Sequence, residues 1–218
     1  DAEKNLSIHL VDVNILYDTS RYNFLELSIK KNFDQPTSLK FQYENLLEEA
    51  NFIVSENNFK DQIIHIIVSN MIVDKNTNLE YMNEDIKIKS LILEIKFICL
   101  SKSLIKNIHN QFKKINLNVL NIYCSSYVKS IHYNENFKTK KNLIFLDIGF
   151  ERTSAVFLKK NVFQFLNSIP IGGNNITKDI SKVLKLSNSY SEKLKITFNV
   201  KENNNFFDHS ISNLYSEI

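Results

Sequence analysis

The residues best suited to chemistry gather around Asp147 and in the glycines that follow it, which are the only glycines in the chain. Asp147 ends an apolar run, and Gly149 follows two residues later. Gly172 and Gly173 come directly before a segment with helical periodicity. Glycine permits positive φ and lets a ligand approach the main chain. We therefore interpret the two glycine sites as two turns that face one phosphate-bearing ligand.

The first glycine site offers two kinds of chemistry. Asp147 can hold a hydrated Mg²⁺ ion or orient a water molecule, because hard oxygen ligands suit that ion. The backbone N–H groups of the turn, together with the hydroxyls of Thr153 and Ser154, can donate to phosphate oxygens. The plain alternative is a simple turn at the end of a strand.

The second glycine site precedes the N-terminus of a predicted helix. Unsatisfied N–H groups and partial positive charge make such a terminus favourable for an anion. The alternative is a tight strand-to-helix connection with Asn174 as the cap. The spacing matches neither a Walker A loop nor the Gly-x-Gly-x-x-Gly fingerprint, so both of those nucleotide-binding folds are disfavoured.

The periodicity of the apolar residues predicts the strands and helices that must position these sites. We expect one sheet made of strands 63–68, 90–100 and 119–122, with a helix packed on it that Ser101 or Ser103 caps and that ends at Asn116. Gln35-Pro36-Thr37-Ser38 is expected to break the preceding strand, and residues 189–192 to form a capping box. The remaining predictions are strands at 8–16, 24–31, 143–147, 153–158 and 162–169, the last three as hairpins, and helices at 42–54, 125–133, 176–184 and 192–198.

Composition narrows the functional class. The net charge is only +3, and the lysines are interspersed with Asp and Glu, which does not describe a nucleic-acid-binding stripe. Cys99 and Cys124 lie in apolar surroundings without a ligand spacing, so we expect two reduced, buried thiols. No apolar run reaches membrane-spanning length.

Four motifs resemble those of a known family. LDIGFERTSAVFLKK, from Leu146, resembles the second phosphate loop of actin-like ATPases. SIPIGGNNITKDISKVL, from Ser168, resembles the segment that follows this loop in the FtsA family of bacterial cell-division proteins. HIIVSNMIVD, at His65–Asp74, resembles the opening of that family's inserted subdomain, and SEKLK, from Ser191, resembles the family segment that comes next after the glycine motif.

The resemblance implies an α/β, actin-like (ribonuclease H-like) ATPase fold, in which nucleotide lies between two lobes and a small α+β subdomain is inserted. On that analogy, residues 1–60 and 123–141 belong to the first lobe, and residues 61–122 form the inserted subdomain. Residues 142–192 form the core of the second lobe, and residues 193–218 begin an outer subdomain that is cut short. We expect the chain to be a fragment that lacks both ends.

The resemblance also implies roles for particular residues. Asp147 would act on Mg²⁺ or on water. The expected phosphate contacts are Gly149, Phe150, Arg152, Thr153 and Ser154; Gly172, Gly173 and Asn174 would lie beside ribose or phosphate, and Glu192 and Lys195 on the adenosine side. Phe150 and Glu151 stand where the family has glycines, so we expect Glu151 to point away from the ligand or the loop to bind phosphate weakly.

The implied function is that of an ATP-binding, actin-like protein that polymerises and links the FtsZ ring to the membrane. Its expected location is the cytoplasmic side of the cell membrane at the division site, reached through a C-terminal helix that this chain lacks; the FtsZ-binding region is incomplete. We expect at most weak ATPase activity, and none from this chain alone. Two alternatives stay open: another actin-like ATPase, such as the type IV pilus assembly protein PilM, or a nucleotide-free interaction module.

Overall fold

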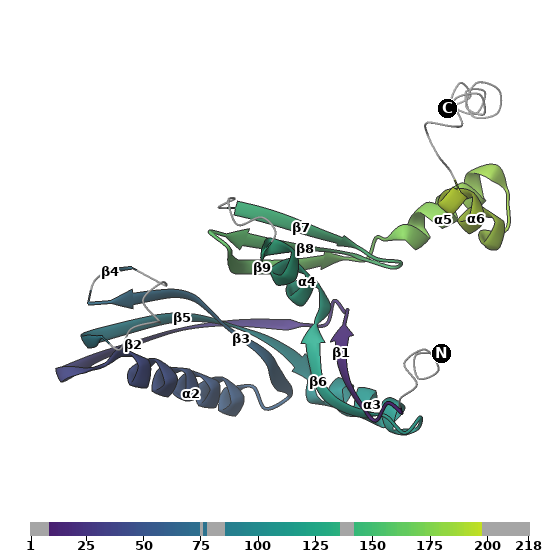
Figure 1. Ribbon diagram of the computed structural model, residues 1–218. Coiled ribbons are helices and arrows are strands. Elements are labelled where there is room, and N and C mark those ends of the chain that lie inside the picture. The colour runs from purple at the N-terminus through teal and green to yellow at the C-terminus, as the bar shows by residue number, and fades with distance from the viewer. Residues whose placement is uncertain (1–8, 75, 78–85, 136–141, 198–218) are drawn as a thin grey trace. The chain divides into compact units, whose positions relative to one another are not determined.

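The computed structural model describes residues 9–74, 76–77, 86–135 and 142–197 (Figure 1). The chain forms two compact units, the first containing residues 1–146 and 154–168, and the second residues 147–153 and 169–218. Among the described residues, no helix combines the length and the apolar character that crossing a bilayer demands. The elements are β1 (Asp12–Tyr17), β2 (Asn23–Ser38), α2 (Leu39–Asn57), β3 (Asp61–Val73), β4 (Asn76–Thr77), β5 (Lys87–Ser101), α3 (Lys102–Lys113), β6 (Asn118–Cys124), α4 (Ser125–Asn134), β7 (Asn142–Ile148), β8 (Thr153–Lys159), β9 (Val162–Ile169), α5 (Gly173–Leu184) and α6 (Asn188–Thr197).

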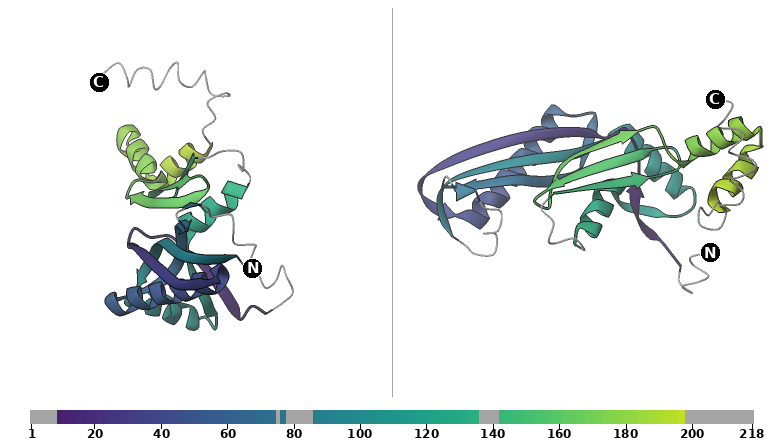
Figure 2. Two further views of the ribbon diagram at one scale, coloured as in Figure 1. Left: turned by 90° about the vertical axis from the view of Figure 1, so that its left-hand side faces the viewer. Right: turned by 90° about the horizontal axis from the view of Figure 1, so that it is seen from above.

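The largest sheet of the first unit has the strand order β2-β5-β3-β4, and α2 lies along one of its faces (Figures 1 and 2). Central strand β5 pairs antiparallel with β2 on one side and with β3 on the other. Alternate residues of β5 point toward α2, because side chains alternate across a strand. The fully buried side chains of this layer include Leu39, Leu46, Ala50, Leu91, Leu93, Ile95 and Phe97.

The expectation of one sheet from strands 63–68, 90–100 and 119–122 is wrong for the third strand. β6 instead pairs in parallel with β1, from Asp12 opposite Asn118 to Tyr17 opposite Cys124. Both edges of β5 are already occupied, one by β3 and the other by β2, so β6 does not lie beside β5 in this sheet. The domain boundaries expected from the family resemblance stay a prediction, and most of residues 193–218 lies outside the described part of the chain.

The expected break at Gln35-Pro36 is also wrong, since β2 continues to Ser38. Its pairing with β5 is interrupted between Asn32 and Thr37 and then resumes. Proline removes a backbone N–H, which an edge strand tolerates, and β2 is the edge of its sheet. The expected helix end is confirmed: α3 stops at Lys113, and Asn116 has a φ of 58°.

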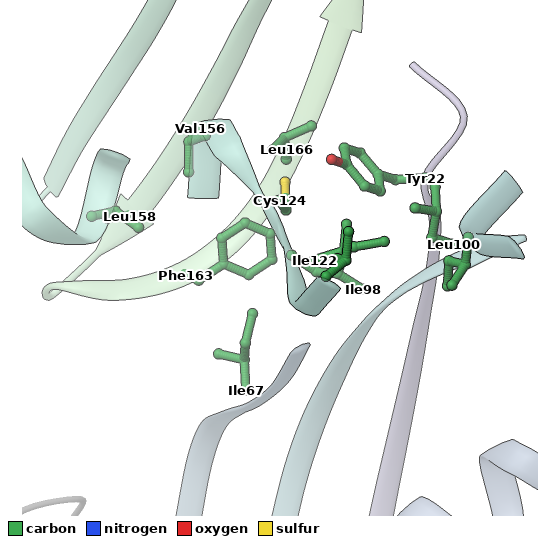
Figure 3. Close-up of a cluster of buried hydrophobic side chains, with 12 residues drawn as sticks. Tyr22, Ile67, Ile98, Leu100, Ile122, Cys124, Val156, Leu158, Phe163 and Leu166 are labelled. Carbon is green, nitrogen blue, oxygen red and sulfur yellow. The ribbon is translucent and has the colours of Figure 1, made fainter. Parts of the chain in front are cut away.

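The strands β7, β8 and β9 form a three-stranded sheet in sequence order, as the hairpin prediction requires. Lys160 and Asn161, which join β8 to β9, both have positive φ, the geometry of a type I′ hairpin turn. One face of this sheet packs into a second apolar core of the first unit, where Phe163 of β9 lies beside Ile122 and Cys124 of β6 (Figure 3). Both cysteines are free and buried, as expected.

Candidate functional site

The turn between β7 and β8 and the beginning of α5 are joined through their main chains. The N–H group of Gly149 donates to the carbonyl of Arg152 at 2.8 Å and closes the turn. The carbonyls of Gly149 and Phe150 accept from the N–H groups of Gly173 and Asn174, at 2.9 and 2.7 Å. The turn therefore satisfies two of the donors that a helix leaves open at its N-terminus.

Gly172 lies where the two segments press together. A Cβ atom at this position would lie 2.6 Å from Arg152 N and from the carbonyl oxygens of Gly149 and Phe150. Its φ of −149° is extended, so the requirement for glycine is steric. None of the three glycines has positive φ, and the expectation based on that property is wrong for them. The group that approaches the backbone at Gly172 is the backbone of the β7–β8 turn.

The cap of α5 comes from a neighbour of the expected residue. Asn175, rather than Asn174, accepts from the N–H of Gly172 through its side-chain oxygen at 3.0 Å, and its own N–H donates to the Gly172 carbonyl at 2.9 Å. These reciprocal bonds fix the backbone just before the helix. Asn174 contributes its N–H to the turn instead.

The two hydroxyls expected to bind phosphate make hydrogen bonds inside the protein. Thr153 Oγ1 donates to the carbonyl of Ile171 at 2.7 Å, which ties the start of β8 to the residue before the paired glycines. Ser154 is almost fully buried, and its Oγ donates to Ser168 Oγ at 3.2 Å. A phosphate contact by either hydroxyl requires that its present bond open.

Glu192 and Lys195 meet at the first turn of α5. Lys195 Nζ donates to the Gly173 carbonyl at 3.1 Å, to Thr177 Oγ1 at 2.9 Å and to Glu192 Oε2 at 2.7 Å. The Thr177 hydroxyl also donates to Glu192. The hydrogen bond from Lys195, followed by that from Thr177, lowers the pKa of the Glu192 carboxyl. The cluster presents a charged pair beside Gly173.

Sequence reasoning missed Thr177 as a member of this cluster, although it stands in the glycine motif. It lies four residues after Gly173 and therefore on the same face of α5, which is the signal that identifies it. The expected capping box at 189–192 is wrong. Ser187 Oγ accepts from the N–H of Tyr190 at 3.3 Å, and α6 begins at Asn188. The Glu192 carboxylate binds Thr177 and Lys195 instead of the helix start.

Asp147 is half-buried near the end of β7, and Arg152 is half-buried just before β8. Glu151 is exposed at the tip of the turn. Within the ranges that the structure describes, no group of three or more His, Cys, Asp or Glu side chains could hold a metal ion. Magnesium commonly uses one or two carboxylates together with water and phosphate oxygens. A single carboxylate at Asp147 fits an ion that arrives with a nucleotide.

Comparison with known proteins confirms the resemblance to FtsA. The family model "Cell division protein FtsA" matches residues 144–213. FtsA of Staphylococcus epidermidis is 27% identical over 139 residues, which cover 62% of this chain and 29% of that protein. FtsA of Helicobacter pylori is 23% identical over 138 residues, which cover 62% of this chain and 27% of that protein. The chain thus spans less than a third of the length of these relatives.

The fold is that of the actin-like ATPases. A solved PilM–PilN type IV pilus biogenesis complex is similar over 89% of this chain and 52% of that chain, with a TM-score of 0.50 and 13% sequence identity. At that identity the likeness concerns the fold alone. The sequence relatives are FtsA proteins, so the chain is FtsA-like and the PilM alternative is not favoured.

Proposed function

We propose that the intact protein binds ATP with Mg²⁺, and that the turn at residues 149–154 holds the phosphates. The observation that carries this proposal is the main-chain junction between that turn and α5, in a chain with an actin-like fold and an FtsA-like sequence. Three backbone hydrogen bonds and the close approach at Gly172 hold the turn in one shape without a ligand. A preformed loop loses little conformational freedom when it binds.

The roles of individual residues are assigned from the bonds at the turn together with the family resemblance. The first N–H groups of α5 bind the turn, so phosphate contacts fall to the backbone of the turn itself and to Arg152. Asp147 supplies the carboxylate for the ion. Glu192 and Lys195, held beside Gly173, are assigned to the adenosine side. These groups bind and orient a nucleotide, and ATP acts chiefly by stabilising one conformation of the protein.

The wider role that we propose is the one the FtsA relatives imply: self-association into filaments that link the FtsZ ring to the cytoplasmic face of the cell membrane at the division site. Support comes from the family match at residues 144–213. Hydrolysis is expected to be weak, because Glu151 adds negative charge to a turn that would hold phosphates.

Calorimetry with Mg-ATP on the full-length protein tests the proposal. We expect binding by the native protein and a loss of at least tenfold in affinity for Asp147→Ala, because the ion loses its carboxylate. Asp179→Ala is the matched control, since Asp179 is an exposed carboxylate on α5 outside the cluster. Its affinity should equal that of the native protein.

The second candidate is a nucleotide-free interaction module. It is favoured by the internal hydrogen bonds of the Thr153 and Ser154 hydroxyls. If the native protein shows no heat of binding with Mg-ATP, and Asp147→Ala behaves like it, the nucleotide proposal fails and this module remains.

A further inference from the structure

Helix α2 carries an exposed row of aromatic and acidic side chains, which we call the α2 stripe and define as Phe41, Glu44, Glu48 and Phe52. Its opposite face, with Leu46 among others, is buried against the sheet. Phe41 and Phe52 are 58% and 66% exposed. They lie eleven residues, or three turns, apart on one side of the helix, about 16 Å from each other. Neither ring packs into the core of the unit.

Helix α3 carries an exposed row of basic side chains, the α3 stripe, formed by Lys102, Lys106, His109 and Lys113. Its opposite face packs Ile105 into the second core. The α3 stripe also spans eleven residues, so its length along the helix equals that of the α2 stripe.

The two stripes are complementary in charge and in chemistry. Glutamates of the α2 stripe can pair with lysines of the α3 stripe, and the exposed phenylalanine rings can receive lysine ammonium groups over their faces. Helix α2 contains four glutamates and one lysine, whereas the chain as a whole has a net charge of +3. Local negative charge on a positive chain favours a basic partner.

A second copy of the same chain is the partner that these observations select. Within one copy, α2 is fixed on β2, β3 and β5, while α3 is fixed on β5 and β6. Both stripes point away from the cores on which their helices rest. We propose that the α2 stripe of one copy docks on the α3 stripe of the next.

Such a contact joins two different patches, so it is heterologous, and the assembly keeps one free stripe at each of its two ends. Growth beyond a dimer follows. The inference deepens the self-association included in the proposed function and rests on it to that extent, although neither helix contains a residue of the proposed nucleotide site.

Sedimentation velocity without nucleotide, over a range of protein concentrations, tests the contact. We expect the native chain to associate at low salt and to dissociate near 1 M salt, where charges are screened beyond about 3 Å. The double variant Glu44→Lys, Glu48→Lys should stay monomeric, and so should Lys106→Glu, Lys113→Glu. A mixture of these two variants should associate again, because each supplies one unaltered stripe.

The control is Glu135→Lys with Asp179→Lys, which alters net charge as much as the α2 variant does but lies outside both stripes. It should associate like the native chain. Circular dichroism checks that every variant is folded. Phe41→Ser with Phe52→Ser should weaken association without any change of charge, and it stands in for the α2 charge variant if that variant does not fold.

The inference is overturned by a native chain that is monomeric at every concentration, by a mixture that does not associate, or by a control that behaves like the α2 variant. Association of the α2 charge variant at native strength would count equally against it. These results do not depend on ATP. Loss of ATP binding with intact association, or the reverse, therefore tells which of the two proposals has failed.

Discussion

The layer of α2 on its sheet and the junction of α5 with the β7–β8 turn are held together by different means. In the first, apolar side chains such as Leu46 and Phe97 are fully buried between a helix and a strand. In the second, carbonyls of Gly149 and Phe150 bind N–H groups of α5, and Gly172 contributes by having no side chain. Truncating a side chain should therefore destabilise the first region, whereas adding a side chain at the junction should destabilise the second.

The largest effect is expected from Leu46→Ala in the first region. Leu46 is fully buried, so the change removes apolar contacts and leaves a cavity, at a cost of about 2–5 kcal/mol in the free energy of unfolding. Urea denaturation measures it. Leu120→Ala is the control, because Leu120 is exposed and its truncation should shift stability by about 0.5 kcal/mol or less. Equal effects of the two changes would contradict the packing argument.

Gly172→Ala is expected to have the next largest effect, in the second region. The added Cβ meets three backbone atoms at 2.6 Å, none of which belongs to a flexible side chain, so the turn and α5 must separate. Overpacking of this kind costs about 1–3 kcal/mol. Hydrogen exchange at the Gly173 and Asn174 amides should become faster, since their acceptors lie on the turn.

Gly173→Ala is the matched control for that change. Its Cβ would lie 3.4 Å from Lys195 Nζ, the end of a flexible side chain, so the substitution should be accommodated. If the α5 amides exchange hydrogen at the same rate in both alanine variants, the close approach at Gly172 is not what holds the junction.

The last effect concerns a main-chain hydrogen bond inside the first unit. His65 Nε2 accepts from the N–H of Cys124 at 2.9 Å, which requires a neutral ring. Burial lowers the pKa of His65 from 6.5 to about 4. The folded state thus disfavours the charged ring, and the stability present above pH 6.5 should decline as pH falls from 6.5 toward 4.

His65→Phe should remove that part of the pH dependence, which urea titrations at several pH values can measure. His132→Phe is the control, because His132 is exposed on α4 and should leave the slope unchanged. If the free energy of unfolding of His65→Phe depends on pH as it does in the native protein, groups other than His65 cause that dependence.

Periodicity was sufficient to predict the side-chain-packed regions. The alternation of Leu91, Leu93 and Ile95 predicts β5, and the helical spacing of Leu46, Ala50 and their neighbours predicts α2. Which strands share a sheet was not predictable from these patterns. The sequence patterns of β2 and β6 predict two strands, and only the folded structure shows that β2 takes an edge of β5 while β6 pairs with β1.

The candidate site was predictable in position but not in its bonding. The glycines indicated both the β7–β8 turn and the start of α5. Their rarity alone does not show whether a ligand or another main-chain segment occupies the space beside Gly172. The roles of Thr177 and Asn175 depend on which groups meet after folding, and residue type does not specify that.

The junction also explains why the β7–β8 turn can depart from a glycine-rich sequence. Helix α5 recognises the carbonyls of Gly149 and Phe150, which every amino acid possesses, and no residue from 149 to 152 has positive φ. Substitution at positions 150 and 151 is therefore compatible with the same backbone, whereas position 172 admits no side chain without displacement. The turn can therefore change in sequence at two positions while its backbone keeps one shape, whereas the helix that it meets depends on a single glycine.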